Sequence, residues 1–373
     1  MNYKFFTSES VAAGHPDKIC DQISDAVLDE AIKIDPKSRV AVETLVTKDR
    51  VVLAGELTCP QKLDFASIAR KVIKELGYNK KEFGFWHKSP IEVFIHQQSP
   101  DIARGVDEGG AGDQGMMFGY ATSETPELMP LPIILAHRLV MEMDECRQSK
   151  KIPYLKPDGK SEVKVIYENG FPKEVLQVVL CVPHKESTSQ EKLKEDLFLF
   201  VAQPILKQYG FMIKKENLIV NGAGPWILNG PAADTGVTGR KIIVDTYGGA
   251  ARHGGGCFSG KDPTKVDRTG AYAARFIAKN IVAAGLALKV EVQIAYVIGR
   301  REPLVHSVET FGTNKVSMKK IEDFAWNLID LSPLGIINTL RLRQPIYRET
   351  AAYGHFGRNK FPWEKIVAKS SKN

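Results

Sequence analysis

Hydrophobic residues recur along this chain with two different periods, and each period predicts a different element. From position 19 to position 31 an apolar residue returns every four positions, which is typical of a helix with one apolar stripe. From 40 to 46 apolar and more polar side chains alternate, which predicts a strand and places Glu43 on its opposite face. A turn at 48–50 and a second strand over 51–58 complete a predicted hairpin.

The order helix, hairpin, helix, strand returns along the chain, which indicates repeated units of one type. The first unit is completed by a helix over 65–76 and a strand over 91–95. The second has a helix beginning near Pro130, strands over 162–167 and 175–182, a helix from 193 to Tyr209 and a strand over 218–220. The third has a helix over 273–284, strands over 290–298 and 305–311, and helices over 321–329 and 335–340. We therefore expect an α+β fold of three related units, divided into an N-terminal domain (1–100), a central domain (110–228) and a C-terminal domain (229–373).

The apolar pattern disappears between Gln97 and Gly115, where the sequence reads QQSPDIARGVDEGGAGDQG. A segment of this length without elements of its own is typical of a binding loop, and we predict that residues 98–112 form a mobile active-site loop. Gly110, Gly112 and Gly115 match the dinucleotide pattern GxGxxG. That fingerprint follows a strand, whereas the residues before Gly110 are polar, so we discount a dinucleotide site.

Composition and charge narrow the class of protein. The 373 residues are 43% hydrophobic and 25% charged, and no apolar run approaches the ~18–20 residues of a membrane span. The N-terminus lacks a basic segment followed by an apolar one, and the five cysteines lie far apart. We therefore expect a cytoplasmic protein without a signal peptide, a disulfide framework or a cysteine zinc site. Much of the net charge of +7 comes from scattered lysines, which does not favour a nucleic acid as partner.

One glycine-rich stretch, from Asp245 to Asp267, concentrates the candidate chemistry. It contains six glycines, several cations and two carboxylates near its end. Glycines allow a close approach of the backbone to a ligand, cations suit phosphate, and carboxylates suit a hard metal ion bound to that phosphate. An apolar helical segment follows, whose N-terminus would add partial positive charge. The stretch predicts a polyphosphate site rather than a flexible linker.

The same stretch nearly matches the P-loop motif. Gly255, Gly260 and Lys261 have the spacing GxxxxGK, but Asp262 stands where a P-loop has the Ser or Thr that binds magnesium. The pattern therefore does not support a P-loop NTPase.

Three further carboxylates stand in unusual positions. Asp17 follows Gly14-His15-Pro16 at a predicted helix start, where capping alone explains an aspartate but explains neither His15 nor Lys18. Glu43 and Glu56 interrupt predicted strands, which disfavour carboxylates unless the residue faces water. The residues alone leave both interpretations of these carboxylates open.

Several of these segments resemble the S-adenosylmethionine synthetase family. GHPDK at 14–18, GAGDQG at 110–115 and GGGCFSGKD at 254–262 are similar to its three signatures, and DTYGG, KVDR and TAAYGHFGR are similar as well. The resemblance runs from Phe6 to about Trp363. It implies three α+β domains related by approximate threefold symmetry, in a homo-oligomer built as a dimer of dimers with active sites between subunits.

The resemblance also implies a reaction. The methionine sulfur attacks the 5′ carbon of ATP, and the released tripolyphosphate is hydrolysed to pyrophosphate and phosphate. A neutral thioether needs no general base, whereas the leaving group needs cations placed where negative charge develops.

Site residues follow from the resemblance, position by position. The catalytic side chains would be His15, Lys160, Arg240, Lys241, Lys261 and Lys265. ATP would be bound by His15, Asp158, Lys160, Trp226, Asp234, Arg240, Lys241, Cys257 and Lys261, and methionine by Glu56, Gln98, Asp234 and Lys265. Asp17 and Asp267 would hold two Mg²⁺ ions, and Glu43 one K⁺ ion. The chain departs from the family pattern in a shorter loop between Val106 and Gly110 and in Pro225-Trp226, where Arg and Phe are common.

Two other classes of protein share some of these features. A phosphotransferase or ATPase would use a similar cationic glycine-rich loop, and a basic RNA-binding module would alternate aromatic and basic residues on a strand face. Neither class explains His15, Asp17 and Asp267 together.

Overall fold

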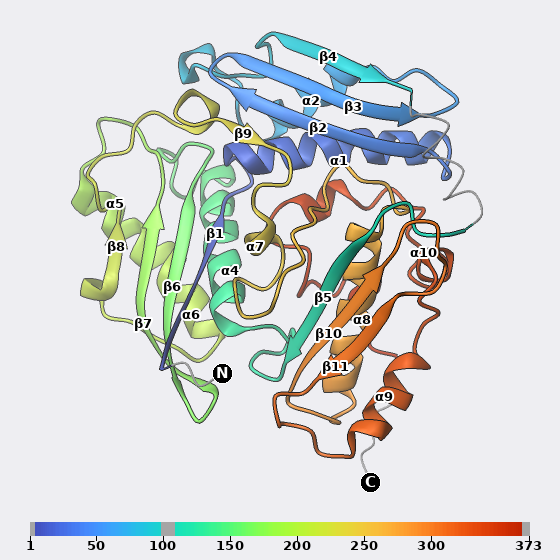
Figure 1. The fold of residues 1–373 in the computed structure, drawn as a ribbon. Helices are drawn as coiled ribbons and strands as arrows, with labels where there is room; N and C mark the ends of the chain where they lie inside the picture. Colours follow the sequence, from blue (N-terminus) through green and yellow to red (C-terminus); the bar gives the residue numbers. More distant parts are fainter. Residues whose placement is uncertain (1–3, 98–108, 368–373) are drawn as a thin grey trace.

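The computed structural model describes residues 4–97 and 109–367, and its elements form three sheets around a common centre (Figure 1). Each sheet is covered on its inner side by one long helix, and these three helices are α1 (Pro16–Ile34), α4 (Leu131–Gln148) and α8 (Val266–Ala283). The α+β class and the three related units predicted from the sequence are confirmed. Gln98 and most of the predicted mobile loop 98–112 lie outside the described residues.

The first unit supplies most of the sheet drawn at the top of Figure 1. Its elements are β1 (Phe5–Val11), α1, β2 (Arg39–Thr47), β3 (Arg50–Thr58), α2 (Phe65–Glu75) and β4 (Ile91–His96). The predicted hairpin is confirmed as β2 and β3, which pair from Arg39 opposite Thr58 to Thr47 opposite Arg50. β4 then runs parallel to β3.

The second unit repeats this order, and the described part of the third unit repeats it up to the hairpin and then ends in helices. The second has β5 (Gly115–Thr122), α4, β6 (Lys160–Glu168), β7 (Phe171–Cys181), the helical segment α5 (Gln190–Leu197) to α6 (Gln203–Gln208), and β8 (Leu218–Val220). The third has β9 (Gly236–Val237), α7 (Ile242–Asp245), α8, β10 (Lys289–Tyr296), β11 (Val305–Glu309), α9 (Met318–Trp326) and α10 (Pro333–Thr339). The hairpin predicted across Asn169-Gly170 is confirmed as β6 and β7.

The first strand of each unit pairs in the sheet of another unit. β1 pairs with β6, β5 pairs with β10, and β9 pairs with β2, each time antiparallel. The resulting orders are β1-β6-β7-β8, β5-β10-β11 and β9-β2-β3-β4. Each unit therefore gives its first strand to the sheet of another unit, and the three exchanges close a ring. This arrangement agrees with the approximate threefold symmetry expected from the sequence. The domain boundaries read from the sequence remain a prediction.

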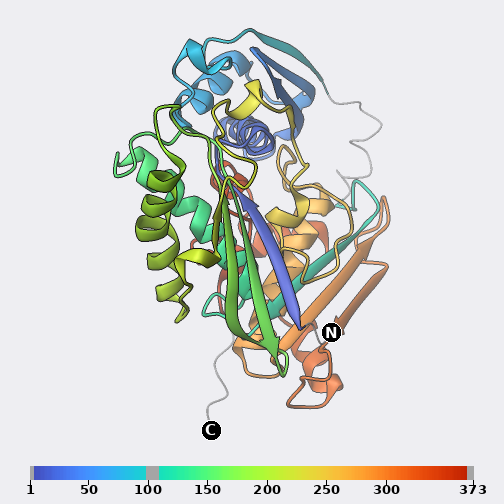
Figure 2. The ribbon, with the colours of Figure 1, turned by 90° about the vertical axis from the view of Figure 1, so that its left-hand side faces the viewer.

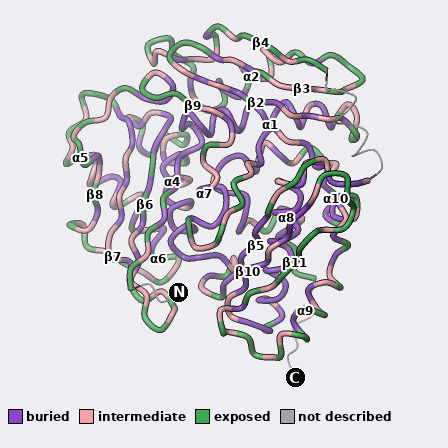
Figure 3. The backbone as a smooth tube through the Cα atoms, viewed as in Figure 1, coloured by how far each residue is buried: buried purple, intermediate pink, exposed green. Residues whose placement is uncertain are grey.

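The long helices form the interior of the molecule, as Figures 2 and 3 show. Sixteen of the nineteen residues of α1 and sixteen of the eighteen residues of α8 are buried, so both helices are enclosed on all sides. The prediction of a single apolar stripe on α1 was therefore incomplete. The face opposite that stripe is buried too, and it carries carboxylates.

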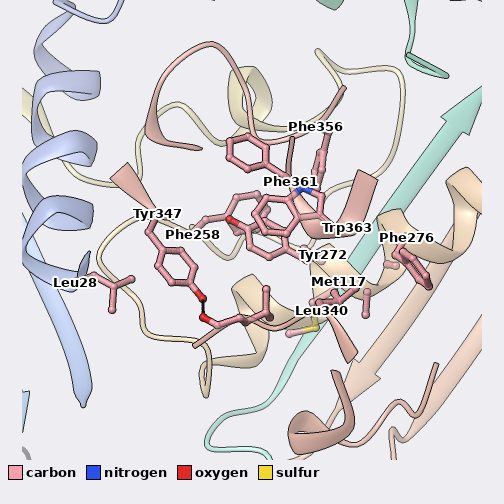
Figure 4. Close-up of a cluster of buried hydrophobic side chains, with 14 of the residues drawn as sticks. Leu28, Met117, Phe258, Tyr272, Phe276, Leu340, Tyr347, Phe356, Phe361 and Trp363 are labelled. Atoms are coloured by element: carbon pink, nitrogen blue, oxygen red, sulfur yellow. Dashed lines mark hydrogen bonds between the residues drawn. The ribbon is translucent and has the colours of Figure 1, made fainter. Parts of the chain in front are cut away.

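An aromatic cluster joins α8, the glycine-rich stretch and the C-terminal segment (Figure 4). Tyr272 stacks on Trp363 with ring centroids 3.6 Å apart, and Trp363 stacks on Phe361 at 5.0 Å. Phe258, from the glycine-rich stretch, packs against Tyr272 at 5.7 Å. The stretch is thus anchored by a buried aromatic side chain, which a flexible linker would lack.

Candidate functional site

The N-terminus of α1 holds the first group of candidate residues. His15 caps the helix, and its Nδ1 accepts a hydrogen bond from the Asp17 amide at 3.2 Å. Both side chains are buried, at 1% and 2% exposure. Burial, together with the charges of Lys241 and Lys160, lowers the pKa of His15 to about 3. His15 is therefore a neutral imidazole at physiological pH and can hydrogen-bond to a phosphate without adding charge.

Two cations from the turn after β9 face Asp17. Lys241 Nζ lies 3.1 Å from Asp17 Oδ2, and Arg240 lies 3.6 Å from Asp17 Oδ1. Asp17 Oδ1 also accepts the amide of Val237 at 3.0 Å. Lys160, exposed at the start of β6, is close enough for its charge to lower the pKa of His15. The structure thus brings five predicted site residues together around the start of α1.

The glycine-rich stretch holds the second group. Its residues 260–262 run along β2, where Lys261 lies opposite Ala41 and the Val42 amide donates to the Gly260 carbonyl at 3.1 Å. Lys261 Nζ lies 2.5 Å from Asp267 Oδ2 in the first turn of α8. Lys265 Nζ lies 2.6 Å from Asp262 Oδ2.

Asp262 explains the failed P-loop match. Its carboxylate is fully buried and accepts hydrogen bonds from the amides of Val40 at 2.7 Å and Thr264 at 2.9 Å. The residue that follows Lys261 therefore holds the stretch against β2, whereas a P-loop uses the same position to bind a metal ion.

Cys257 joins the two groups. A side chain on Gly239, the residue before Arg240, would come within 2.6 Å of Cys257 Cβ, so the Cys257 side chain packs closely against the Gly239 backbone. Burial raises the pKa of the Cys257 thiol, and the charges of Lys261, Asp267 and Glu43 also act on it. The two predicted magnesium ligands lie in different groups, Asp17 in the first turn of α1 and Asp267 in the first turn of α8.

Glu43 and Glu56 share the outer face of the first sheet with Lys261. Glu56 lies opposite Ala41 in the ladder, and Ala41 lies opposite Lys261, so these three residues point to one side. Glu43 is exposed on the same face, which confirms the side predicted from the alternation in β2. Glu56 Oε1 is 3.7 Å from Nε2 of His96.

The remaining predicted residues lie around the turn from 226 to 234. Asp158 is buried, its carboxylate accepts the Gly159 and Gly230 amides at 2.7 and 3.0 Å, and burial raises its pKa to about 7. Asp234 is exposed, and its amide donates to the Gly230 carbonyl at 3.1 Å. Trp226 is half-buried. Asp158 therefore acts on this turn through Gly230.

Sequence reasoning missed a row of aspartates on α1. Asp17, Asp21, Asp25 and Asp29 stand four residues apart, and each accepts a backbone amide from the third unit, at Val237, Gly239, Gly260 and Tyr347 respectively. Lys18 lies between Asp21 and Asp245 at 2.8 and 2.5 Å, and burial raises the pKa of Asp21 to about 7. The sequence contains a signal for this row, because four aspartates at helical spacing form a stripe along α1 that is as regular as the apolar stripe.

Within residues 4–97 and 109–367, no group of three or more His, Cys, Asp or Glu side chains is arranged to hold a metal ion. In the same part of the chain, no helix is long and apolar enough to cross a membrane.

Comparison with known proteins places these residues in a family. Models of the N-terminal, central and C-terminal domains of S-adenosylmethionine synthetase match residues 3–100, 108–226 and 228–365. The S-adenosylmethionine synthase of Desulforudis audaxviator is 50% identical over 98% of this chain and 97% of its own length. That of Treponema denticola is 50% identical over 97% of this chain and 95% of its own length. The chain belongs to the S-adenosylmethionine synthetase family.

Proposed function

We propose that the cations around Asp17 and those around Asp267 together bind the triphosphate of ATP during adenosyl transfer. The protein makes S-adenosylmethionine from ATP and L-methionine. The sulfur lone pair forms the bond to the 5′ carbon, the bond from that carbon to the phosphate oxygen breaks, and tripolyphosphate leaves with its electron pair. Water then hydrolyses tripolyphosphate to pyrophosphate and phosphate.

The observation that carries this assignment is the buried His15 at the start of α1, next to Asp17 and to the cations Lys241 and Arg240 that face Asp17. An imidazole without charge can donate one hydrogen bond to the oxygen that leaves the 5′ carbon, while the surrounding cations stabilise the charge that develops there. Arg240, Lys241 and Lys160 would contact one part of the phosphate chain, and Lys261 and Lys265 the other. A thioether attacks directly, so this reaction requires no nucleophile of the protein with an adjacent base.

The carboxylates fit the metal ions that the family uses. Magnesium is commonly bound by one or two carboxylates and by substrate phosphates, and Asp17 and Asp267 each lie beside cations assigned to the phosphates. These two side chains would hold two Mg²⁺ ions, which supply positive charge to the phosphates. Glu43 offers a carboxylate on the outer face, and we assign to it one K⁺ ion.

Methionine binding is assigned to the same outer face. Glu56 would bind the ammonium group of methionine together with Asp234, and Lys265 would lie near its carboxylate. Gln98 would complete this site from the loop that begins there. The ATP contacts of Asp158, Trp226 and Cys257 are part of the same proposal.

The outer face also supports a homo-oligomer, built as a dimer of dimers with each site between subunits. Phe94 on β4 lies opposite Ala54 of β3, and Ala54 lies opposite Glu43, so Phe94 is on this face, where it is 61% exposed. Exposed apolar side chains of this size suit burial against a second copy. Glu43 and Glu56 would then face residues of that copy. Sedimentation of the Phe94→Asp variant, expected to shift toward the monomer, tests this step. Location in the cytoplasm remains a prediction.

The products test the function. With ATP, methionine, Mg²⁺ and K⁺, phosphorus NMR should show pyrophosphate and phosphate in equal amounts, and proton NMR should show the S-methyl group of a sulfonium product. Added tripolyphosphate should be hydrolysed as well, and omission of K⁺ should slow the reaction. Stoichiometric ADP or AMP without a sulfonium would contradict the proposal and support a phosphotransferase.

A further inference from the structure

Two loops of the site are attached to α1 in the same way. Asp21 Oδ1 accepts the amide of Gly239 at 2.8 Å, and Asp25 Oδ1 accepts the amide of Gly260 at 2.8 Å. Arg240 and Lys241 follow the first glycine, and Lys261 follows the second. In both loops, therefore, the amide that an α1 carboxylate binds stands directly before a cation assigned to the phosphates.

Both attachment points require glycine. Gly239 and Gly260 have φ angles of +78° and +82°, in the left-handed region. A side chain on Gly239 would meet Cys257, and one on Gly260 would approach the Val42 carbonyl oxygen to 2.1 Å. Each loop is thus held on one side by a carboxylate of α1 and on the other side by close packing against Cys257 or β2.

The charges of the two carboxylates are balanced inside the protein. Lys18 Nζ lies 2.8 Å from Asp21 Oδ2, and Arg268 binds both oxygens of Asp25 at 2.7 and 2.9 Å. Lys18 and Arg268 are fully buried. The aspartates therefore do not draw Arg240, Lys241 or Lys261 away from a ligand, and each carboxylate keeps one fixed orientation.

We propose that Asp21 and Asp25 are positioning residues that set the spacing between the two groups of phosphate-binding cations. Four residues of an α-helix rise by about 6 Å, so a single rigid element sets the distance between the two attached glycines. The inference rests on the proposed roles of Arg240, Lys241 and Lys261. Neither aspartate touches the substrate, and each acts through the loop that its carboxylate binds.

Asp21→Asn is the variant that tests the proposal, and Asp29→Asn is its matched control. An asparagine at 21 leaves Lys18 paired with Asp245, but it accepts at one oxygen only and cannot serve both Gly239 and Lys18. Asp29 lies on the same face of α1 and accepts two amides, from Tyr347 and Arg348, both at 2.9 Å and outside the site. Each substitution therefore removes one hydrogen bond accepted by an aspartate of the row on α1.

The assay is hydrolysis of inorganic tripolyphosphate in the presence of Mg²⁺, with urea unfolding of each variant measured in parallel. Asp21→Asn should raise the KM for tripolyphosphate at least tenfold, because displaced cations bind less well, whereas Asp29→Asn should keep the wild-type KM. Both variants should lower the urea midpoint by similar amounts. Equal KM values in the two variants would overturn the proposal and leave Asp21 a purely structural residue.

A second variant covers the case in which Asp21→Asn does not fold. Gly239→Ala disturbs the same loop and leaves the Lys18–Asp21 pair in place, so it should also raise the KM at least tenfold; an unchanged KM would contradict the positioning role. Failure of the wild-type protein to hydrolyse or bind tripolyphosphate would instead contradict the proposed function, so the two failures are distinguishable.

Discussion

Replacement of Arg268 by lysine tests how the glycine-rich stretch is held in place. Arg268 is fully buried and makes six hydrogen bonds: two to Asp25, one each to the carbonyls of Phe258 and Lys261, and one each to the hydroxyls of Tyr272 and Thr350. A lysine keeps the charge but has only three donors, on one atom. At least three of the six bonds are therefore lost.

The magnitude follows from that count. A buried hydrogen bond contributes about 1 kcal/mol, so three lost bonds cost about 3 kcal/mol of the free energy of unfolding. The shorter lysine side chain also leaves unfilled volume, which adds to the loss. We expect the urea midpoint to fall while the slope of the transition stays unchanged.

The control is the same substitution at an exposed ion pair. Arg50 contacts Glu92, and both side chains are about half exposed, at 50% and 44%. Arg50→Lys should therefore cost less than about 1 kcal/mol. A loss for Arg268→Lys no larger than that of Arg50→Lys would refute the argument that the fork of donors at Arg268 holds the stretch.

Three further predictions concern metal dependence, pH and backbone strain. Asp17→Asn and Asp267→Asn should each raise the Mg²⁺ concentration needed for half-maximal activity about tenfold with the circular dichroism spectrum unchanged; unchanged Mg²⁺ dependence in both would remove them from the metal sites. The pKa of His15 is about 3 in the folded protein and 6.5 ordinarily, so His15 lowers the free energy of unfolding as the pH falls from 6.5 toward 3 and has no such effect above pH 6.5. His15→Asn should therefore make the free energy of unfolding less dependent on pH in this range, by up to about 1.4 kcal/mol per pH unit. Gly260→Ala places a methyl group 2.1 Å from a β2 carbonyl at positive φ and should lower the unfolding free energy by at least about 1–2 kcal/mol in urea titrations; a loss below 0.5 kcal/mol would contradict the strain.

The elements themselves were largely predictable, because hydrophobic periods report which face of an element is buried. The hairpins over residues 39–58 and 160–181 formed where alternation and turn residues indicated them. β5 was missed, because six of its eight residues are buried in a continuous run and show no alternation. Gly119 in this strand lies so close to α8 that a side chain would come within 2.0 Å of the Ala274 backbone.

The pairing of strands was not predictable from periods. β1 and β6 are separated by about 150 positions, and a period identifies the buried face of a strand but not its neighbour. β9 has only two residues, so it carries no period at all.

The site was partly predictable. The glycines and cations of 245–267 indicate phosphate by their chemistry alone. In contrast, the roles proposed for Lys160 and Asp234 came only from the resemblance to the family, because nothing local distinguishes them from surface residues. Glu56 stood out as a carboxylate within a predicted strand, but the role proposed for it also came from the resemblance. The spacing of the aspartates on α1 is visible in the sequence, but it did not predict a buried row, because an acidic stripe on a helix usually faces water.

The exchange of first strands around the ring has a consequence for folding during synthesis on the ribosome. β1 emerges first, but its partner β6 is made only after residue 160, and β2 waits for β9 at residues 236–237. No unit can complete its sheet from its own residues while the chain is growing. Cutting the gene between units would therefore yield fragments that each lack one edge strand and expose another, and such edges invite aggregation. Co-expressed complementary fragments, rather than isolated domains, are the pieces that should assemble.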